Sequence, residues 1–185
     1  GGREYALAWH AAKNGHEVVG SPGNAAFENR LGHIIPYKGP EQFADYFEKG
    51  GFDLAVSGSE EPLAAGLGDV MHDRGLPFFG PRRAHARAEW DKGYLHDLLE
   101  PFALMPPGRI FKSRKRAEKY LIEHWHSYEG PCVLKAVGLQ KGKGVIVPDF
   151  LEEAIYYGLE TIMSPRGMGD DILLFRAIEC GLAAL

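Results

Sequence analysis

The stretch PCVLKAVGLQKGKGVIV, residues 131–147, decides the fold of the second half of the chain. It is typical of a buried β-strand that carries Lys135 near its end, followed by a loop of glycine and lysine and then by a second strand. Successive side chains of a strand lie on opposite faces. Lys135 can therefore point toward a ligand while its neighbours enter a core.

The loop after this strand, residues 138–144, has the composition of an anion-binding flap. Its three glycines let backbone N–H groups approach an anion closely, and Lys141 and Lys143 add two ammonium groups. It is not a P-loop, because the G-x-x-x-x-G-K-[ST] spacing is absent and no helix is expected at the last glycine. We predict a site for nucleotide phosphates here. The alternative is an ordinary β-hairpin with a solvated basic turn.

Composition narrows the class of protein. The 185 residues are 45% hydrophobic and 25% charged, as in a soluble globular protein of one domain or two small ones. A net charge of −4 and a pI near 6.1 argue against a nucleic-acid partner. The sequence shows no membrane-spanning stretch and no signal peptide, so we expect a cytoplasmic protein with no membrane partner. It gives no indication of an oligomeric state.

The cysteines and histidines point to neither a disulfide nor a metal centre. Cys132 lies inside the predicted strand, so we expect it and Cys180 to be reduced thiols. None of the eight histidines stands in H-E-x-x-H or beside C-x-x-C, and His124 and His126 flank Trp125 near a predicted helix end. We expect surface or capping roles for the histidines.

The first eighty residues alternate short apolar strands with helices, a pattern typical of a parallel sheet with helical crossovers. Strands are predicted at Glu17–Gly20, His33–Pro36, Phe52–Val56 and Phe78–Phe79, and helices after Gly1-Gly2, at Pro40–Lys49 and at Pro62–Asp73. A glycine turn that opens a helix normally follows the central strand of a doubly wound sheet, and no strand precedes Gly1. We therefore expect a fragment, or a sequence trimmed at its N-terminus.

The second half is predicted to be an α+β lid. Residues 81–99 form two predicted helices, the second of which holds Lys92, and Met105–Gly108 is a turn or hinge. Strands and helices then follow at Arg109–Lys112, Arg114–Trp125, Val133–Ala136, Val145–Val147, Phe150–Met163 and Ile172–Phe175.

Six motifs, in one order and register along the chain, resemble the ATP-grasp superfamily and, within it, the phosphoribosylamine–glycine ligase (glycinamide ribonucleotide synthetase) family. They are GGREYAL at residues 1–7, where the family usually has histidine in place of Tyr5, PGN at 22–24, GSEEPLAAGL at 58–67, FGP at 79–81, Lys92 with its helix, and KAVGLQKGKGV at 135–145. The resemblance implies four segments. These are a Rossmann-like pre-ATP-grasp substrate domain at 1–80, a helical start and hinge at 81–107, a lid at 108–176 and the start of a catalytic floor at 177–185.

The resemblance also implies a reaction and a set of nucleotide contacts. Such ligases use ATP to convert the carboxylate of glycine into a glycyl phosphate, which the amine of 5-phosphoribosylamine attacks to give glycinamide ribonucleotide. Carried over residue by residue, the ATP-binding positions are Lys92, Lys135, Gly138, Lys141, Gly142, Lys143 and Gly144. ATP is the implied nucleotide, with magnesium or manganese as the metal.

The N-terminal motifs resemble the sugar-phosphate side of the family. The implied phosphoribosylamine-binding residues are Gly1, Gly2, Arg3, Pro22, Gly23, Asn24, Glu60 and Pro62. Backbone N–H groups at a helix start favour a phosphate, and a carboxylate suits ribose hydroxyls. The alternatives are a frayed terminus for Gly1 and Gly2, and a helix-start role for Glu60 beside Glu61-Pro62.

Several positions depart from the family pattern. Phe175 and Arg176 stand where paired acids are expected, Gly181-Leu182 replace a second acidic pair, and Val137 replaces the usual aspartate. The sequence contains no cluster equivalent to the family's metal ligands, so no metal-binding or catalytic residue is assigned and we expect the 185-residue chain not to complete the reaction alone. The rival hypotheses are a non-catalytic nucleotide-binding scaffold, another ATP-grasp carboxylate–amine ligase and, more distantly, a dehydrogenase.

Overall fold

The computed structural model describes residues 2–23, 25–102, 106, 108–127, 132–137, 144–163 and 172–176. The chain forms two compact units, residues 1–87 and 88–185, and helix α6 (Arg83–Trp90) runs across their boundary. No helix among the residues described is long and apolar enough to cross a membrane.

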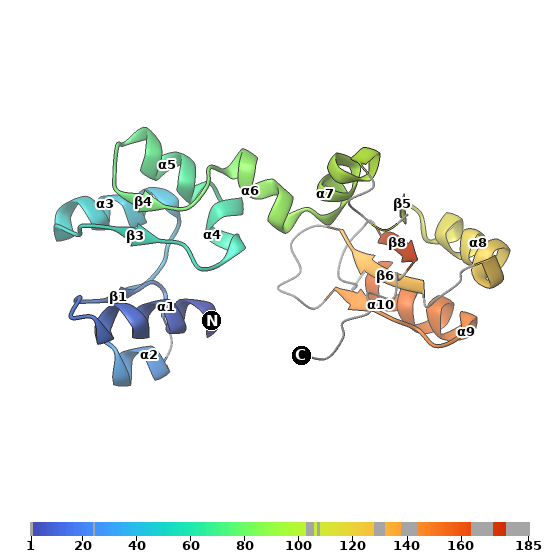
Figure 1. The fold of residues 1–185 in the computed structure, drawn as a ribbon, viewed down its shortest axis with the longest axis horizontal. Helices are drawn as coiled ribbons and strands as arrows, with labels where there is room; N and C mark the ends of the chain where they lie inside the picture. The colour runs from blue at the N-terminus through green and yellow to red at the C-terminus, as the bar shows by residue number, and fades with distance from the viewer. Residues whose placement is uncertain are drawn as a thin grey trace. The chain divides into compact units, whose positions relative to one another are not determined.

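The first unit contains two pairs of parallel strands (Figure 1). β1 (Val19–Gly20) pairs with β2 (His33–Ile34), and β3 (Ala55–Val56) pairs with β4 (Phe78–Phe79). Each pair is joined through a helix, so the predicted parallel arrangement with helical crossovers is confirmed. The four described strands form two separate two-stranded sheets, and β1 does not pair with β3.

The helices of this unit are α1 (Gly2–Lys13), α2 (Ala25–Arg30), α3 (Pro40–Gly50), α4 (Glu60–Ala64) and α5 (Leu67–Asp73). The single helix predicted at Pro62–Asp73 is wrong, because Gly66 adopts φ 96°, a left-handed conformation that ends α4 and precedes α5. The sequence does not predict helix α2. This helix is short and buries only Phe27, which leaves little periodicity to detect.

The core of the first unit lies where α3 and α5 pack on β3. Its buried members are Ala44, Phe47, Ala55, Leu67 and Met71. Gly68 of α5 is packed so closely that a Cβ atom there would lie 2.0 Å from the carbonyl oxygen of Pro81. The absence of a side chain at Gly68 therefore lets the chain after β4 cross α5 at backbone contact.

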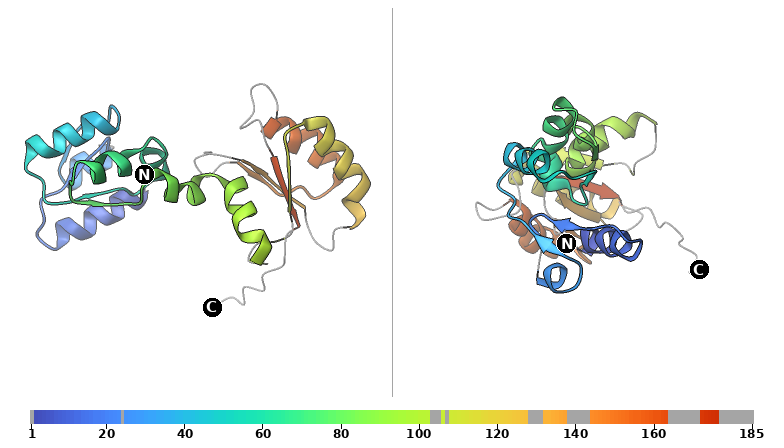
Figure 2. Two further views of the ribbon diagram at one scale, coloured as in Figure 1. Left: turned by 90° about the horizontal axis from the view of Figure 1, so that it is seen from above. Right: turned by 90° about the vertical axis from the view of Figure 1, so that its left-hand side faces the viewer.

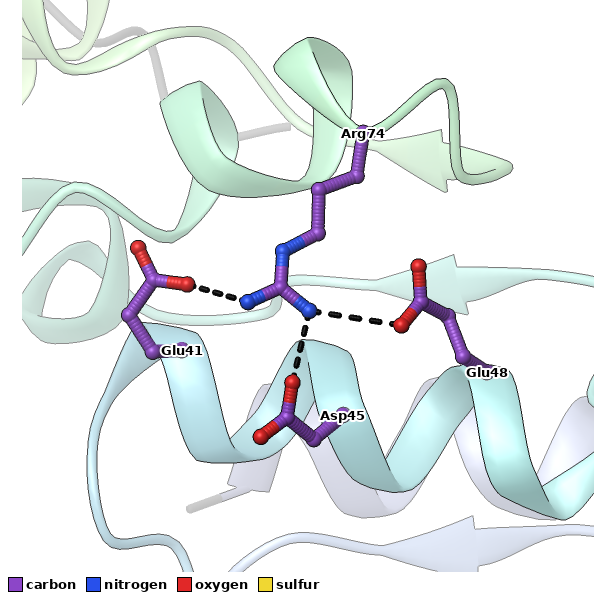
Figure 3. A network of polar contacts seen from close by, with 4 residues as sticks. All are labelled: Glu41, Asp45, Glu48 and Arg74. Carbon is purple, nitrogen blue, oxygen red and sulfur yellow. Dashed lines mark hydrogen bonds and ion pairs between the residues drawn. The ribbon is translucent and has the colours of Figure 1, made fainter.

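Arg74, which ends α5, is held by three acids of α3 (Figure 3). Its guanidinium donates to Asp45 at 2.7 Å, to Glu48 at 3.3 Å and to Glu41. The hydrogen bond from Arg74 is the main cause that lowers the pKa of Asp45. This network connects α5 to α3 on the surface, outside the apolar core.

We expect Arg74→Gln to lower the melting temperature of the chain by a few degrees at pH 7. Because the pKa of Asp45 is lowered on folding, its contribution to stability is present above the unfolded pKa of about 3.9 and is lost as the pH falls below it. The difference from the native chain should therefore shrink below about pH 4. Thermal melts across pH 3–7 measure this, with Arg30→Gln as an exposed control in the same unit. A difference that stays constant across this range would contradict the role of Asp45.

The second unit is built on a four-stranded antiparallel sheet with strand order β5-β8-β6-β7. The strands are β5 (Gly108–Phe111), β6 (Cys132–Ala136), β7 (Val145–Ile146) and β8 (Ile172–Arg176). The two strands predicted from residues 131–147 are thus present and pair antiparallel with each other. The predicted α+β architecture of this half is confirmed.

Helices from two segments cover one face of this sheet. The first is α8 (Arg114–His124), which ends in a 3-10 turn, η2 (Trp125–Ser127). The second is a continuous helix from Leu151 to Met163, whose middle is π-helical: α9 (Leu151–Glu153), η3 (Ala154–Leu159) and α10 (Glu160–Met163). Both segments bury side chains against Leu134 and Leu174, and the left view of Figure 2 shows them on the same side of the sheet.

Candidate functional site

The face of β6 that carries Lys135 is opposite the helix-covered core. Cys132, Leu134 and Ala136 are buried, whereas Val133 and Lys135 are half-buried and alternate with them. Burial raises the pKa of the Cys132 thiol to about 12, and Cys132 is not in a disulfide. Cys180 lies outside the described residues. The alternation predicted for Lys135 is therefore present, with its core-facing neighbours among the best-covered residues of the unit.

The strand register places Lys135 in a row with Ile110 of β5. Leu173 of β8 is the backbone pairing partner of both residues, since β8 lies between β5 and β6. Directly paired residues of an antiparallel sheet share a face. Ile110 and Lys135 therefore lie on the same face, and the next residue on that face after Lys135 is Val137.

Helix α7 (Lys92–Leu99) begins against this same face. A Cβ atom at Gly93 would lie 3.1 Å from Cγ1 of Val137 and 3.2 Å from Cδ1 of Ile110. Lys92 immediately precedes Gly93, so the first turn of α7, which begins at Lys92, lies at the sheet face that carries Lys135. In the left view of Figure 2, α7 (light green) lies on the opposite side of the sheet from α8 and α10.

The N-terminus of α7 is capped by an acid of the chain itself. Asp91 is the N-cap residue, and its Oδ1 accepts a hydrogen bond from the backbone N–H of Tyr94 at 3.0 Å. This bond takes up one of the free donors of the first turn. We therefore expect a phosphate at this end to be bound by the ammonium group of Lys92 and not by the helix terminus alone.

The strands that flank the predicted cationic flap are paired at its base. The N–H of Ala136 donates to the carbonyl oxygen of Gly144 at 2.8 Å, and Lys135 pairs with Val145. Gly138, Lys141, Gly142 and Lys143 lie outside the described residues, so their assignment to ATP stays a prediction. Phe175 and Arg176, which replace expected acids, are described through the backbone of β8 only.

In the first unit, the start of α1 meets the start of α4. The guanidinium of Arg3 donates to Oε2 of Glu60 at 2.9 Å, and the two side chains are 64% and 19% exposed. Gly58 permits this approach, because a Cβ atom there would lie 2.7 Å from Cγ of Glu4. Two predicted site residues that are far apart in the sequence, Arg3 and Glu60, are therefore in contact.

The structure also locates other residues that were predicted for the sugar-phosphate side. Gly2 begins α1, and Pro62 lies within α4. Gly23 follows β1 with φ 69° and lies against Ile34, since a Cβ atom at Gly23 would be 2.3 Å from Cγ2 of that residue. Pro22 and Gly23 follow β1, whereas Arg3 and Glu60 lie at the starts of α1 and α4. Gly1 and Asn24 are outside those residues.

Glu60 both begins helix α4, as the alternative interpretation predicts, and forms the ion pair with Arg3. Glu60 is the first residue of α4, Ser59 is its N-cap, and acids are favoured in a first turn. A carboxylate has about four acceptor positions, so a single bond from Arg3 leaves capacity for a ligand. Elsewhere, no three or more His, Cys, Asp or Glu side chains within the described ranges are grouped as a metal site requires.

Comparison with known proteins supports one family across both units. Residues 1–89 match the family described as phosphoribosylglycinamide synthetase, N domain. A phosphoribosylamine–glycine ligase of Ralstonia nicotianae is 36% identical over 178 residues, which is 92% of this chain and 40% of that protein. Along most of its length the chain is similar to phosphoribosylamine–glycine ligases.

Solved structures of this family and of related folds agree with the architecture. The crystal structure of phosphoribosylamine–glycine ligase from Thermotoga maritima superposes with a TM-score of 0.71 at 27% identity, over 96% of this chain and 42% of that one. N5-carboxyaminoimidazole ribonucleotide synthetase from Thermus thermophilus shares the fold at 17% identity, with a TM-score of 0.64 over 96% of this chain and 45% of that one. The chain spans about 40% of the length of the curated family members that it matches.

Two features of the candidate site are not evident from the sequence. The first is the close packing of Gly93 against Val137, which the sequence analysis does not predict. A glycine inside a helical pattern is a signal that another segment packs closely there. The pairing of Arg3 with Glu60 is also not predicted, because nothing in a single sequence links positions 57 residues apart.

Proposed function

We propose that this chain supplies the substrate domain and nucleotide lid of a phosphoribosylamine–glycine ligase, which joins glycine to 5-phosphoribosylamine at the expense of ATP. The observation that carries the proposal is that Lys135 and the first turn of α7, with Lys92, share one face of the lid sheet. The curated relatives named phosphoribosylamine–glycine ligase support the substrates.

The lysines are proposed to act on the phosphates of ATP. Ammonium groups close to the β- and γ-phosphates offset negative charge as a carboxylate oxygen approaches the γ-phosphorus. The glycine carboxylate forms an O–P bond while the bond from that phosphorus to the leaving oxygen of ADP breaks. The amine of phosphoribosylamine then attacks the acyl carbon, phosphate leaves, and the amine gives up a proton.

The lid hairpin is proposed to protect the acyl phosphate from water. Its strands β6 and β7 are anchored through Leu134 and Ile146, which pack with the helix-covered core. Residues 138–143 connect the two strands, and this connection begins three positions after Lys135 in the sequence. Exclusion of water matters because an acyl phosphate is open to hydrolysis.

The Arg3–Glu60 pair is proposed to bind the sugar phosphate. The guanidinium of Arg3 is a group that suits a phosphate, and Glu60 has acceptor oxygens for ribose hydroxyls. The ion pair holds both side chains in place before a ligand arrives. Magnesium or manganese is expected in the family, but the described residues contain no ligand group for it, so no step here is assigned to a metal.

Calorimetric titration of the 185-residue chain with ATP and magnesium tests the nucleotide site. We expect weak binding, with a dissociation constant on the order of 1 mM. The reason is that the second unit, residues 88–185 and here called the lid unit, is the only part of the chain proposed to contact the nucleotide. Inorganic tripolyphosphate should compete, since the proposed contacts are to phosphates. Binding that is absent at several times this concentration, or unchanged in a Lys92→Ala/Lys135→Ala double variant, would contradict the proposal.

A further inference from the structure

Gly93 stands at a point in the lid unit where a side chain has little room. It is buried in the first turn of α7, between Val137 after β6 and Ile110 of β5. Glycine is unfavourable within a helix relative to alanine. The close packing accounts for its presence, because a Cβ atom added at Gly93 would lie 3.1 Å and 3.2 Å from side-chain methyl carbons of these two residues.

We propose that Gly93 and Val137 form a spacer that sets the distance between Lys92 and Lys135, and so tunes the affinity of the two lysines for nucleotide phosphates. Gly93 directly follows Lys92 on α7, and Val137 lies two residues after Lys135 on the same face of the sheet. The inference rests on the proposed nucleotide site. Both residues act through the lysines and are positioning residues.

Val137 makes this contact stiff. As a β-branched residue it has few χ1 rotamers, so it cannot easily turn a methyl group away. It also stands where the family resemblance places an aspartate, and its Cγ1 methyl group is the atom that faces Gly93 of α7. A methyl group added at Gly93 requires its packed neighbours to give by a few tenths of an ångström. Because Val137 cannot easily turn aside, we expect α7 to shift, which moves Lys92 relative to Lys135.

Gly93→Ala tests the inference, with Val137→Ala and the double variant to complete a cycle. We expect Gly93→Ala to weaken the binding of MgATP and of tripolyphosphate by at least fivefold. The double variant should bind within twofold of Val137→Ala alone, because removing the valine methyls restores the space. This rescue separates a spacing effect from a general loss of structure.

The control and the contrary outcomes are defined by the same titrations. Gly158→Ala alters a close contact with Leu134 on the helix-covered face, so it should leave affinity within twofold while the chain stays folded. If Gly93→Ala does not fold, Val137→Ile adds bulk from the β6 side and should cause the same loss. Native affinity in Gly93→Ala, or no rescue in the double variant, would overturn the spacer alone. Native affinity in Lys92→Ala and Lys135→Ala would overturn the nucleotide site and the spacer with it.

Discussion

Replacement of Lys135 by alanine is expected to weaken the binding of MgATP by about ten- to a hundredfold. A hydrogen bond to a charged group contributes about 1.5–3 kcal/mol, and each 1.4 kcal/mol corresponds to about a factor of ten. Lys135 is half-buried on a strand whose neighbours are fixed in the core, so another side chain cannot easily take over its position. Calorimetry or competition with a fluorescent nucleotide measures the change.

Lys119→Ala is the matched control for this substitution. Lys119 lies on α8 in the same unit, its side chain is 75% exposed, and it pairs with Glu123 one helical turn away. It carries the same charge as Lys135, so its removal tests the effect of net charge alone. Equal losses in the two variants would mean that Lys135 acts only through general charge and not through a defined contact.

Leu134→Ala, one residue earlier on the same strand, is expected to cost about 3 kcal/mol of unfolding free energy in the lid unit. Leu134 is fully buried between the sheet and the helices that cover it. The loss combines reduced apolar burial with a cavity that the surrounding side chains fill only in part. Where the variant is folded, its affinity for MgATP should stay within about twofold of the native value, because position 134 lies on the other face.

Unfolding of the lid unit can be followed through Trp125, which packs against the same core. Denaturant titration of a Trp9→Phe/Trp90→Phe background isolates this signal from the other two tryptophans. Val145→Ala is the control, since Val145 is 46% exposed on the paired strand and should cost less than about 1 kcal/mol. A Leu134 variant as stable as the Val145 variant would contradict the assigned faces of β6.

The lid was predictable from the sequence because its signals are local. The apolar run before Lys135, the glycine-rich loop and the apolar run after it specify a hairpin without reference to distant residues. The sequence also predicts two helices over residues 81–99, and the structure adds that the second begins at Lys92 with Asp91 as its N-cap.

The first unit was less predictable because its strands are short and its contacts are distant. Each described strand has two residues, too few for an alternation to be informative. Gly66 breaks a helix inside an apolar pattern that reads as continuous, since the spacing of Leu63, Leu67 and Met71 fits one helical face. The helix ends here because of the left-handed backbone conformation at Gly66, although the apolar pattern continues.

The candidate sites divide in the same way. Lys135 could be identified from the residue types around it and Lys92 only through the family resemblance, whereas the packing between their two elements depends on Gly93, Ile110 and Val137 from three separate segments. The alternating register across β5, β8 and β6 is what places Ile110 and Lys135 on one face. That register follows from strand order, which a single sequence does not specify.

The most direct test is lysine footprinting of the native chain by mass spectrometry, with an amine-reactive reagent and with or without saturating MgATP. Modification of Lys135 should slow at least fivefold in the presence of the nucleotide, while modification of Lys119 stays unchanged. Equal modification of Lys135 in both conditions, at a concentration where MgATP binding is detected, would contradict its contact with the nucleotide phosphates.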